Sequence, residues 1–406
     1  MDAKLESVAA PEAAAVDYAP TGSLALLLVK NAALTIVTLG IYRFWAKNAL
    51  RRHFWGSIRI AGEPLEYTGR GIELFIGFLI VLGVFIGFAL VQGLVHVLAL
   101  TNPVAAGLLQ LANIIAIALL VQAAIFRARR YRLSRTRWRG IRAGQDGSTW
   151  RYIGLAVGYG MMAGFTLGLA VPRMRVVLEG YVMSNTRFGD RHFSFEAKAR
   201  KLLPVWLPFY GIVLATLVAI GFLVIPDLMH LLQNRNPQDP AALATAVRLT
   251  IGYLALILVV GFGSIVYRVA EFRYFTRSTG LGDIRFGSTA RARRILLTVL
   301  VYLLGILVVN IVLAIVAFLV VAGVERTFGV PAPARDFTAV TVVFGVAALA
   351  VNYVLAYLWL YAPLLKYLCR TFEVQNIAAA DTIVQSSAPA PRFGEGLADA
   401  FDIGVI

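Results

Sequence analysis

Long apolar runs alternate with short polar, arginine-rich stretches along most of the chain. Six of these runs reach or exceed the roughly 20 residues that an α-helix needs to cross a bilayer. They cover residues 72–100, 103–126, 203–225, 246–268, 295–323 and 338–364. The pattern predicts a mainly α, polytopic membrane protein with six spanning helices.

Composition agrees with this class. The chain is 59% hydrophobic and only 15% charged, and its mean hydropathy of +0.75 lies above that of soluble domains. Cys369 is the one cysteine in the sequence, so an intrachain disulfide and a cysteine metal cluster are both excluded. The first 20 residues lack the basic head and apolar centre of a signal peptide, so we expect no processing there.

The net charge of +16 is concentrated between the apolar runs. Four basic clusters cover residues 43–70, 127–151, 173–201 and 268–294, whereas the connections at 101–103, 226–248 and 323–336 carry little net charge. Basic loops favour the cytoplasmic side of a membrane. The charge pattern therefore predicts three antiparallel helix pairs, with the basic clusters and both tails in the cytoplasm.

The basic clusters contain one repeated pattern. Residues 184–195 read SNTRFGDRHFSF, which is typical of a β-hairpin with a turn at Gly189 and Asp190. Residues 274–286 and 131–143 repeat residues 181–193 in the same register, residues 53–65 do so more weakly, and a truncated copy without a return strand begins at Lys366. An isolated two-stranded ribbon is marginal in water. We therefore expect the hairpins to associate into a small cytoplasmic β platform near the anionic inner leaflet, either as one sheet or as several separate ribbons.

A second repeat concerns larger units. The tripeptide Thr-Leu-Gly occurs at 38–40 and at 166–168, in each case before a basic helix and a hairpin. This spacing predicts two repeat units with one layout. The expected organisation is an acidic disordered tail (1–21), a first unit (22–149), a second unit (150–290), a third helix pair with a truncated strand (291–372) and an acidic C-terminal tail (373–406).

Two shorter apolar segments, 22–42 and 150–171, begin the two units. If the hairpins on both sides of 150–171 lie in the cytoplasm, the chain must cross the membrane an even number of times there. We therefore expect both segments to be re-entrant or interfacial, with the glycines between 154 and 168 permitting bends and close packing. The alternative is a single glycine-rich span, with the third hairpin on the opposite side.

Four stretches resemble the YjgN family of bacterial inner-membrane proteins, which is defined by sequence and has no assigned molecular function. They read TLGIYRFWAK (38–47), PLEYTG (64–69), SNTRFGD (184–190) and GEGLADAFDIG (394–404). The resemblance covers nearly the whole chain and implies an inner-membrane location, but it brings no catalytic residues. Where the family is expected to have Pro-Trp, this chain has Pro172 and Arg173.

Motifs that would indicate catalysis are missing from the sequence. The four histidines are scattered without metal-binding spacing, no glycine-rich phosphate loop follows a strand, and no serine lies in a G-x-S-x-G turn. The sequence therefore predicts a non-enzymatic protein without a cofactor or metal.

Arginines of the hairpins are the candidates for contact with anionic lipid or another anionic ligand. They are Arg129, Arg130, Arg137, Arg187, Arg191, Arg273 and Arg285. The expected function is binding of anionic lipid or docking of a cytoplasmic protein, and the alternative is transport of a small anion or lipid. Fixing the topology could also be the only role of the basic hairpins. Nucleic acid is disfavoured as a partner because the basic clusters lie beside lipid.

Polar residues within the apolar runs form a second group of candidates, because burying them in lipid is costly unless they find partners or line water. They are Lys30, Glu73, Gln92, His96, Asn113, Asn310 and Asn352. Asn310 and Asn352 are predicted to hydrogen-bond between helices, with a permeation path as the alternative. Gln92, His96 and Asn113 would line a polar cavity or form a packing cluster.

For the two charged members of this group, simpler roles are available. Lys30 interrupts the first short segment, where a lysine can extend to the headgroups. Glu73 lies at the start of the first long helix and would favour its positive N-terminus.

Overall fold

The computed structural model describes residues 13–234, 240–328 and 334–388. Six helices in this part of the chain are long and apolar enough to cross a membrane, as the apolar runs predict. They are α3 (Gly71–Ala99), α4 (Pro103–Arg135), α7 (Leu203–Asn234), α8 (Pro240–Arg277), α9 (Ala292–Phe328) and the continuous helix formed by α10 (Ala334–Leu355), a π-helical turn (Ala356–Tyr361) and α11 (Ala362–Thr371). The fold is thus consistent with a polytopic membrane protein.

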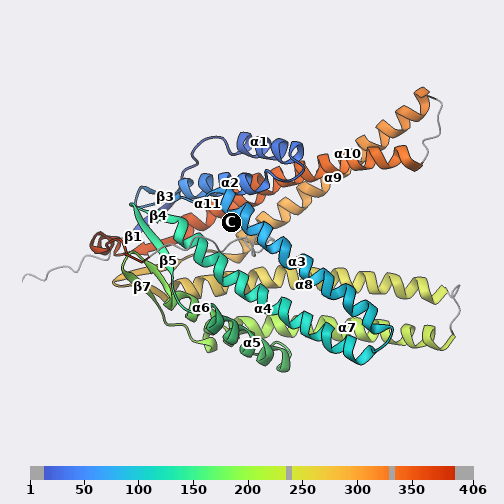
Figure 1. The fold of residues 1–406 in the computed structure, drawn as a ribbon, viewed down its shortest axis with the longest axis horizontal. Coiled ribbons are helices and arrows are strands. Elements are labelled where there is room, and N and C mark those ends of the chain that lie inside the picture. Colours follow the sequence, from blue (N-terminus) through green and yellow to red (C-terminus); the bar gives the residue numbers. More distant parts are fainter. Residues whose placement is uncertain (1–12, 235–239, 329–333, 389–406) are drawn as a thin grey trace, which may run out of the picture.

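Ten short strands form one closed antiparallel barrel, in the order β1-β10-β9-β8-β7-β6-β5-β4-β3-β2. The barrel lies at one end of the molecule, and the long helices extend away from it (Figure 1). The strands are β1 (Ala13–Tyr18), β2 (Ile58–Ile60), β3 (Glu63–Tyr67), β4 (Thr136–Trp138), β5 (Ile141–Gln145), β6 (Thr186–Phe188), β7 (Arg191–Phe195), β8 (Thr279–Leu281), β9 (Ile284–Ser288) and β10 (Phe372–Gln375).

Each hairpin continues directly from a helix. Helices α2 (Arg43–Ser57), α4, α6 (Val171–Ser184) and α8 run into β2, β4, β6 and β8 with at most one intervening residue. A two-residue turn then leads into the return strand, and each turn contains a glycine at positive φ. Such turns match the twist of the paired strands. All four turns therefore lie at the end of the barrel opposite the helices.

The two terminal segments close the barrel. Strand β1 pairs with β2 on one side and with β10 on the other, so that Ala13 lies opposite Gln375. The N-terminal strand thus supplies the return strand that the truncated copy after Lys366 lacks. Two expectations are wrong here. The tail at 1–21 is not disordered throughout, and the hairpins form a closed barrel instead of an open platform, because β1 and β10 pair the two free edges.

The short apolar segments form helical hairpins. Helix α1 (Leu24–Val37) turns back into α2, and α5 (Thr149–Phe165) turns back into α6. Both turns have the same backbone: Leu39 and Leu167 have φ near +50°, and the glycines that follow have φ of +91° and +100°. Both ends of the α5–α6 hairpin join barrel strands, so the chain leaves the barrel here and returns to it.

The largest buried apolar cluster lies inside the barrel. It contains Val16, Trp138, Leu281, Ile284 and Val374, together with residues that follow the last strand. Successive strand residues point to opposite faces, so every second residue of each strand reaches this core. The equivalent strand positions of different repeats thus meet around one axis.

Candidate functional site: a cavity inside the barrel

A cavity of about 670 Å³ occupies the barrel interior and extends to the ends of α4, α6 and α8. Its wall is largely apolar. Five aromatic side chains of the strands contribute to it: Trp138, Phe188, Phe193, Phe286 and Phe372. Neighbouring rings pack with centroids about 6 Å apart, which is typical of aromatic pairs. The repeat therefore places large inward-facing residues around a space that they do not fill.

The C-terminal segment closes the end of the barrel that carries the turns. We call residues 376–385 the plug, which includes the 3-10 helix η3 (Ile377–Thr382). Ile377, Ala380 and Ile383 face the cavity, and Ile383 is only 6% exposed. Burial of these apolar side chains holds the plug in the barrel.

Hydrogen bonds from three hairpin turns hold the plug from outside. Asp190 and Val384 exchange two bonds, of 3.0 Å from the Asp190 N–H and 3.1 Å to the Asp190 carboxylate. The three contacts are Asp190 with Val384, Arg139 with Asp381 at 2.7 Å, and Asp283 with Asn376 at 3.5 Å. The plug is therefore bound to the turns of three different hairpins.

The opposite end of the cavity has a charged mouth, formed by Arg129, Arg175, Glu179, Arg268 and Glu271. Arg175 donates from Nε to Glu271 Oε1 at 2.8 Å and from Nη2 to Oε2 at 3.3 Å. Arg268 Nη1 lies 3.4 Å from the same carboxylate, whereas Arg129 Nη2 lies 4.0 Å from Glu179. Three guanidinium groups and two carboxylates leave the mouth with one excess positive charge.

Glu271 is the most buried member of the mouth, at 3% exposed. Burial by itself lowers the pKa of Arg175, but the hydrogen bonds and the charge of Glu271 outweigh it, so the pKa of Arg175 is raised above its ordinary value. The contact with Glu271 therefore favours the charged form of Arg175. Arg129 is held less tightly and is a third exposed.

Two donors in the cavity lack a hydrogen-bond partner among the described residues. They are the Trp138 Nε1–H, from a side chain 6% exposed, and the Arg129 Nε–H. Buried polar groups are normally satisfied by protein or by ordered water. Both donors are thus available to a polar group that enters from the mouth.

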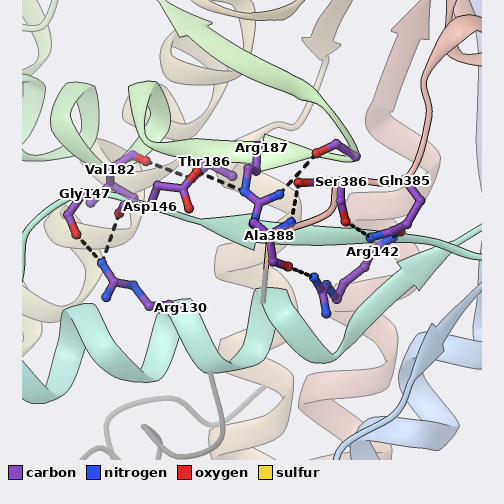
Figure 2. A network of polar contacts seen from close by, with 11 residues as sticks. Arg130, Arg142, Asp146, Gly147, Val182, Thr186, Arg187, Gln385, Ser386 and Ala388 are labelled. Carbon is purple, nitrogen blue, oxygen red and sulfur yellow. Dashed lines mark hydrogen bonds and ion pairs between the residues drawn. The ribbon is translucent and has the colours of Figure 1, made fainter. Parts of the chain in front are cut away.

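The structure distributes the predicted anion-binding arginines over several places. Arg129 is in the mouth, and Arg130 on α4 donates to the carbonyl groups of Asp146 and Gly147 (Figure 2). The remaining five lie as follows: Arg137, Arg187 and Arg285 on β4, β6 and β9, Arg191 beside the turn at Asp190, and Arg273 on α8. Arg187 is paired with Asp146 at 3.0 Å. The seven residues do not form one surface.

The predicted membrane-polar residues are also separated. Asn310 and Asn352 exchange two hydrogen bonds of 3.0 and 3.1 Å between α9 and α10. Lys30 is exposed on α1. Glu73 lies in the first turn of α3 and binds both Tyr131 and Arg135 of α4, the latter at 2.7 Å.

The other three of these residues do not share a cavity wall. Gln92 and His96 are exposed on α3, whereas Asn113 on α4 is buried, and its side-chain amide has no partner among the described residues. None of the three lines the barrel cavity.

Sequence reasoning missed the mouth residues Arg175, Glu179, Arg268 and Glu271, and also Arg142. A signal was available. Arg129 and Glu179 occupy the same place in the repeat, seven residues before Thr136 and Thr186, so that their helices bring both to the barrel. Only a barrel, however, brings these positions together around one opening.

Fold and site together define an integral membrane protein whose helices carry a closed barrel with an internal cavity. A family model described as "Bacterial protein of unknown function (DUF898)" matches residues 19–400, and the chain belongs to this family, the YjgN-like bacterial proteins. No curated protein and no solved structure matches the chain.

Proposed function

We propose that this protein binds an anionic amphiphile, most simply a membrane lipid, with its acyl part in the barrel and its headgroup at the charged mouth. The observation that carries the proposal is the change of character along one cavity, from an aromatic and aliphatic interior to a mouth with three arginines. A role in binding, without catalysis, accounts for these features.

The dimensions of the cavity favour a small molecule. Ligand pockets commonly measure about 300–1,000 Å³ and combine an apolar wall with a few placed polar groups. The barrel cavity, at about 670 Å³, lies in this range, and the unpaired donors of Trp138 and Arg129 would give an entering polar group specific contacts. The apolar wall would stabilise an acyl chain by removing its surface from water.

The charge of the mouth favours an anion over a cation. Arg175 and Arg268 both contact Glu271, whereas Arg129 is only loosely engaged by Glu179. A phosphate or carboxylate headgroup could therefore take a charge-assisted hydrogen bond from Arg129 without breaking the Arg175–Glu271 pair.

The proposed location is the bacterial inner membrane, with the barrel in the cytoplasm. All four basic clusters lie at or next to the barrel, and the weakly charged connections belong to the other ends of the long helices. Basic loops favour the cytoplasmic side. With all hairpins in one barrel, the α1–α2 and α5–α6 hairpins would be re-entrant or interfacial.

The alternative of transport gains no specific support. Asn310 and Asn352 satisfy each other, which is the arrangement expected of a packing contact. Docking of a cytoplasmic protein stays a prediction.

Photocrosslinking tests the proposal. The full chain would be placed in nanodiscs that contain phosphatidylglycerol with a photoreactive acyl chain, and the labelled peptides would be identified by mass spectrometry. We expect labels on barrel peptides that include Phe193 or Phe286. Ala143→Phe extends a side chain into the cavity and should abolish this label, whereas Val218→Phe, on the exposed surface of α7, should leave it unchanged.

A second pair of variants tests the headgroup. Arg129→Gln should reduce the preference for phosphatidylglycerol over phosphatidylcholine by about tenfold, the effect of one charge-assisted hydrogen bond. Arg277→Gln, at an exposed position on the same side of the barrel, should not. Barrel labelling that survives Ala143→Phe, or its absence from the wild-type chain, would overturn the proposal.

A further inference from the structure

A second cavity, of about 410 Å³, lies outside the barrel, beside the turn between β4 and β5. Arg137, Gly140 and Arg142 form one wall, and residues 385–388, which follow the plug, form the other. Figure 2 shows how Arg142 reaches the second wall: its backbone N–H donates to Gln385 Oε1 at 2.7 Å, and its guanidinium donates to the carbonyl of Ala388.

The first wall concentrates positive charge. Glu66 lies directly opposite Arg137 on β3, but no ion pair joins the two side chains. Arg137 and Arg142 lie directly opposite each other on neighbouring strands, an arrangement that is destabilising for like charges unless something lies between them. The backbone of Arg137 is paired in the sheet, whereas its guanidinium makes no hydrogen bond or ion pair with the described part of the chain. The nearby Arg187 is already occupied by Asp146.

The crowding affects the ionisation of Arg142. Burial and the charges of Arg187, Arg137 and Arg135 lower the pKa of Arg142. A bound anion would reverse this effect, because an opposite charge within a few ångströms favours the charged form of the guanidinium.

The second wall offers neutral donors. The Ser386 hydroxyl accepts a hydrogen bond from the Ala388 N–H at 3.3 Å, so its own O–H is free to donate, and Ser387 also lines the cavity. Two guanidinium groups together with a serine hydroxyl are a donor set suited to a tetrahedral oxyanion.

We propose that this cavity binds a phosphate group carried by a soluble metabolite or by free phosphate. Its position favours a soluble source over a lipid. Gly140 is part of the hairpin turn, and the turns lie at the end of the barrel that points away from the long helices (Figure 1). This anion site is distinct from the charged mouth, which lies at the other end of the strands.

Binding here would act on the plug. The residues of the second wall follow Ile383 and Val384 directly, so an anion held by both walls would tie the plug to the β4–β5 hairpin. Phosphate should therefore slow hydrogen exchange in residues 377–388, since binding stabilises the closed form against local opening.

The test uses the full chain in nanodiscs of pure phosphatidylcholine, titrated with inorganic phosphate against chloride at equal ionic strength. Calorimetry should give saturable binding, and hydrogen exchange of residues 377–388 should slow. Arg137→Gln should weaken binding by at least about tenfold, because one charge-assisted contact is lost. Arg285→Gln, at an exposed arginine on the outer face of β9, should change it less than twofold.

Three results would overturn the proposal. One is the absence of saturable phosphate binding, and another is an equal loss in the Arg137 and Arg285 variants. The third is slower exchange with phosphatidylglycerol nanodiscs but not with phosphate, which would assign the site to lipid.

Discussion

Truncation of Ile383 should loosen the plug without disturbing the rest of the barrel. This side chain is 6% exposed and lies in the largest buried apolar cluster. Replacing a buried isoleucine by alanine commonly costs about 2–5 kcal/mol, and the lower part of this range suits a residue at the end of a barrel. We take about 2–3 kcal/mol, which corresponds to a roughly 30- to 150-fold rise in the population of the opened plug.

Hydrogen exchange measures this population directly, because exchange of a protected amide follows local opening. The informative amide is that of Val384, which donates to the Asp190 carboxylate. Val384→Ala is the matched control, since the neighbouring side chain is 61% exposed and should change exchange by less than about threefold. Equal exchange rates in the two variants, or slow exchange throughout in Ile383→Ala, would refute the assignment of the segment as a buried plug.

Three further predictions concern a turn, a helix contact and pH. Gly189→Ala should raise exchange of the plug far more than Gly282→Ala, because both glycines have φ near +60° but only a Cβ at 189 would collide with the Val384 carbonyl. In a double-mutant cycle measured by thermal unfolding in detergent, Asn310→Val and Asn352→Val should show a coupling of about 1 kcal/mol, and strict additivity would contradict the pair. Burial lowers the pKa of His53 below 6.5, so stability should fall as pH drops through 6.5, and His53→Gln should flatten that dependence; an unchanged slope would contradict it.

The helices could be predicted from the sequence because their signal is local. Each apolar run is long enough to span a bilayer by itself, and no long-range contact is needed to recognise it. The inward-facing residues of each hairpin were implicit in the alignment of the copies, since Phe193 and Phe286 occupy the same register. How the hairpins assemble into one barrel, however, could not be read from the hairpins alone.

Closure of the barrel could not be predicted because its seam lies in an unremarkable segment. Strand β1 reads AAAVDY, which has little of the β-branched and aromatic content that marks a strand. Its partners β2 and β10 belong to opposite ends of the chain, and local patterning contains no signal for such pairing. The mouth was missed for the same reason, since Arg129, Arg175 and Glu271 come from three separate helices.

The seam between Ala13 and Gln375 sets an order of events during synthesis. At about 5–20 residues per second, the first strand waits on the order of 20–70 s for its partner, while the helices between them are inserted. Until then the sheet has two open edges, which are templates for pairing with other chains. The barrel can therefore close only after the last strand has been synthesised. A prematurely terminated chain keeps exposed strand edges, and these edges distinguish it from the finished protein.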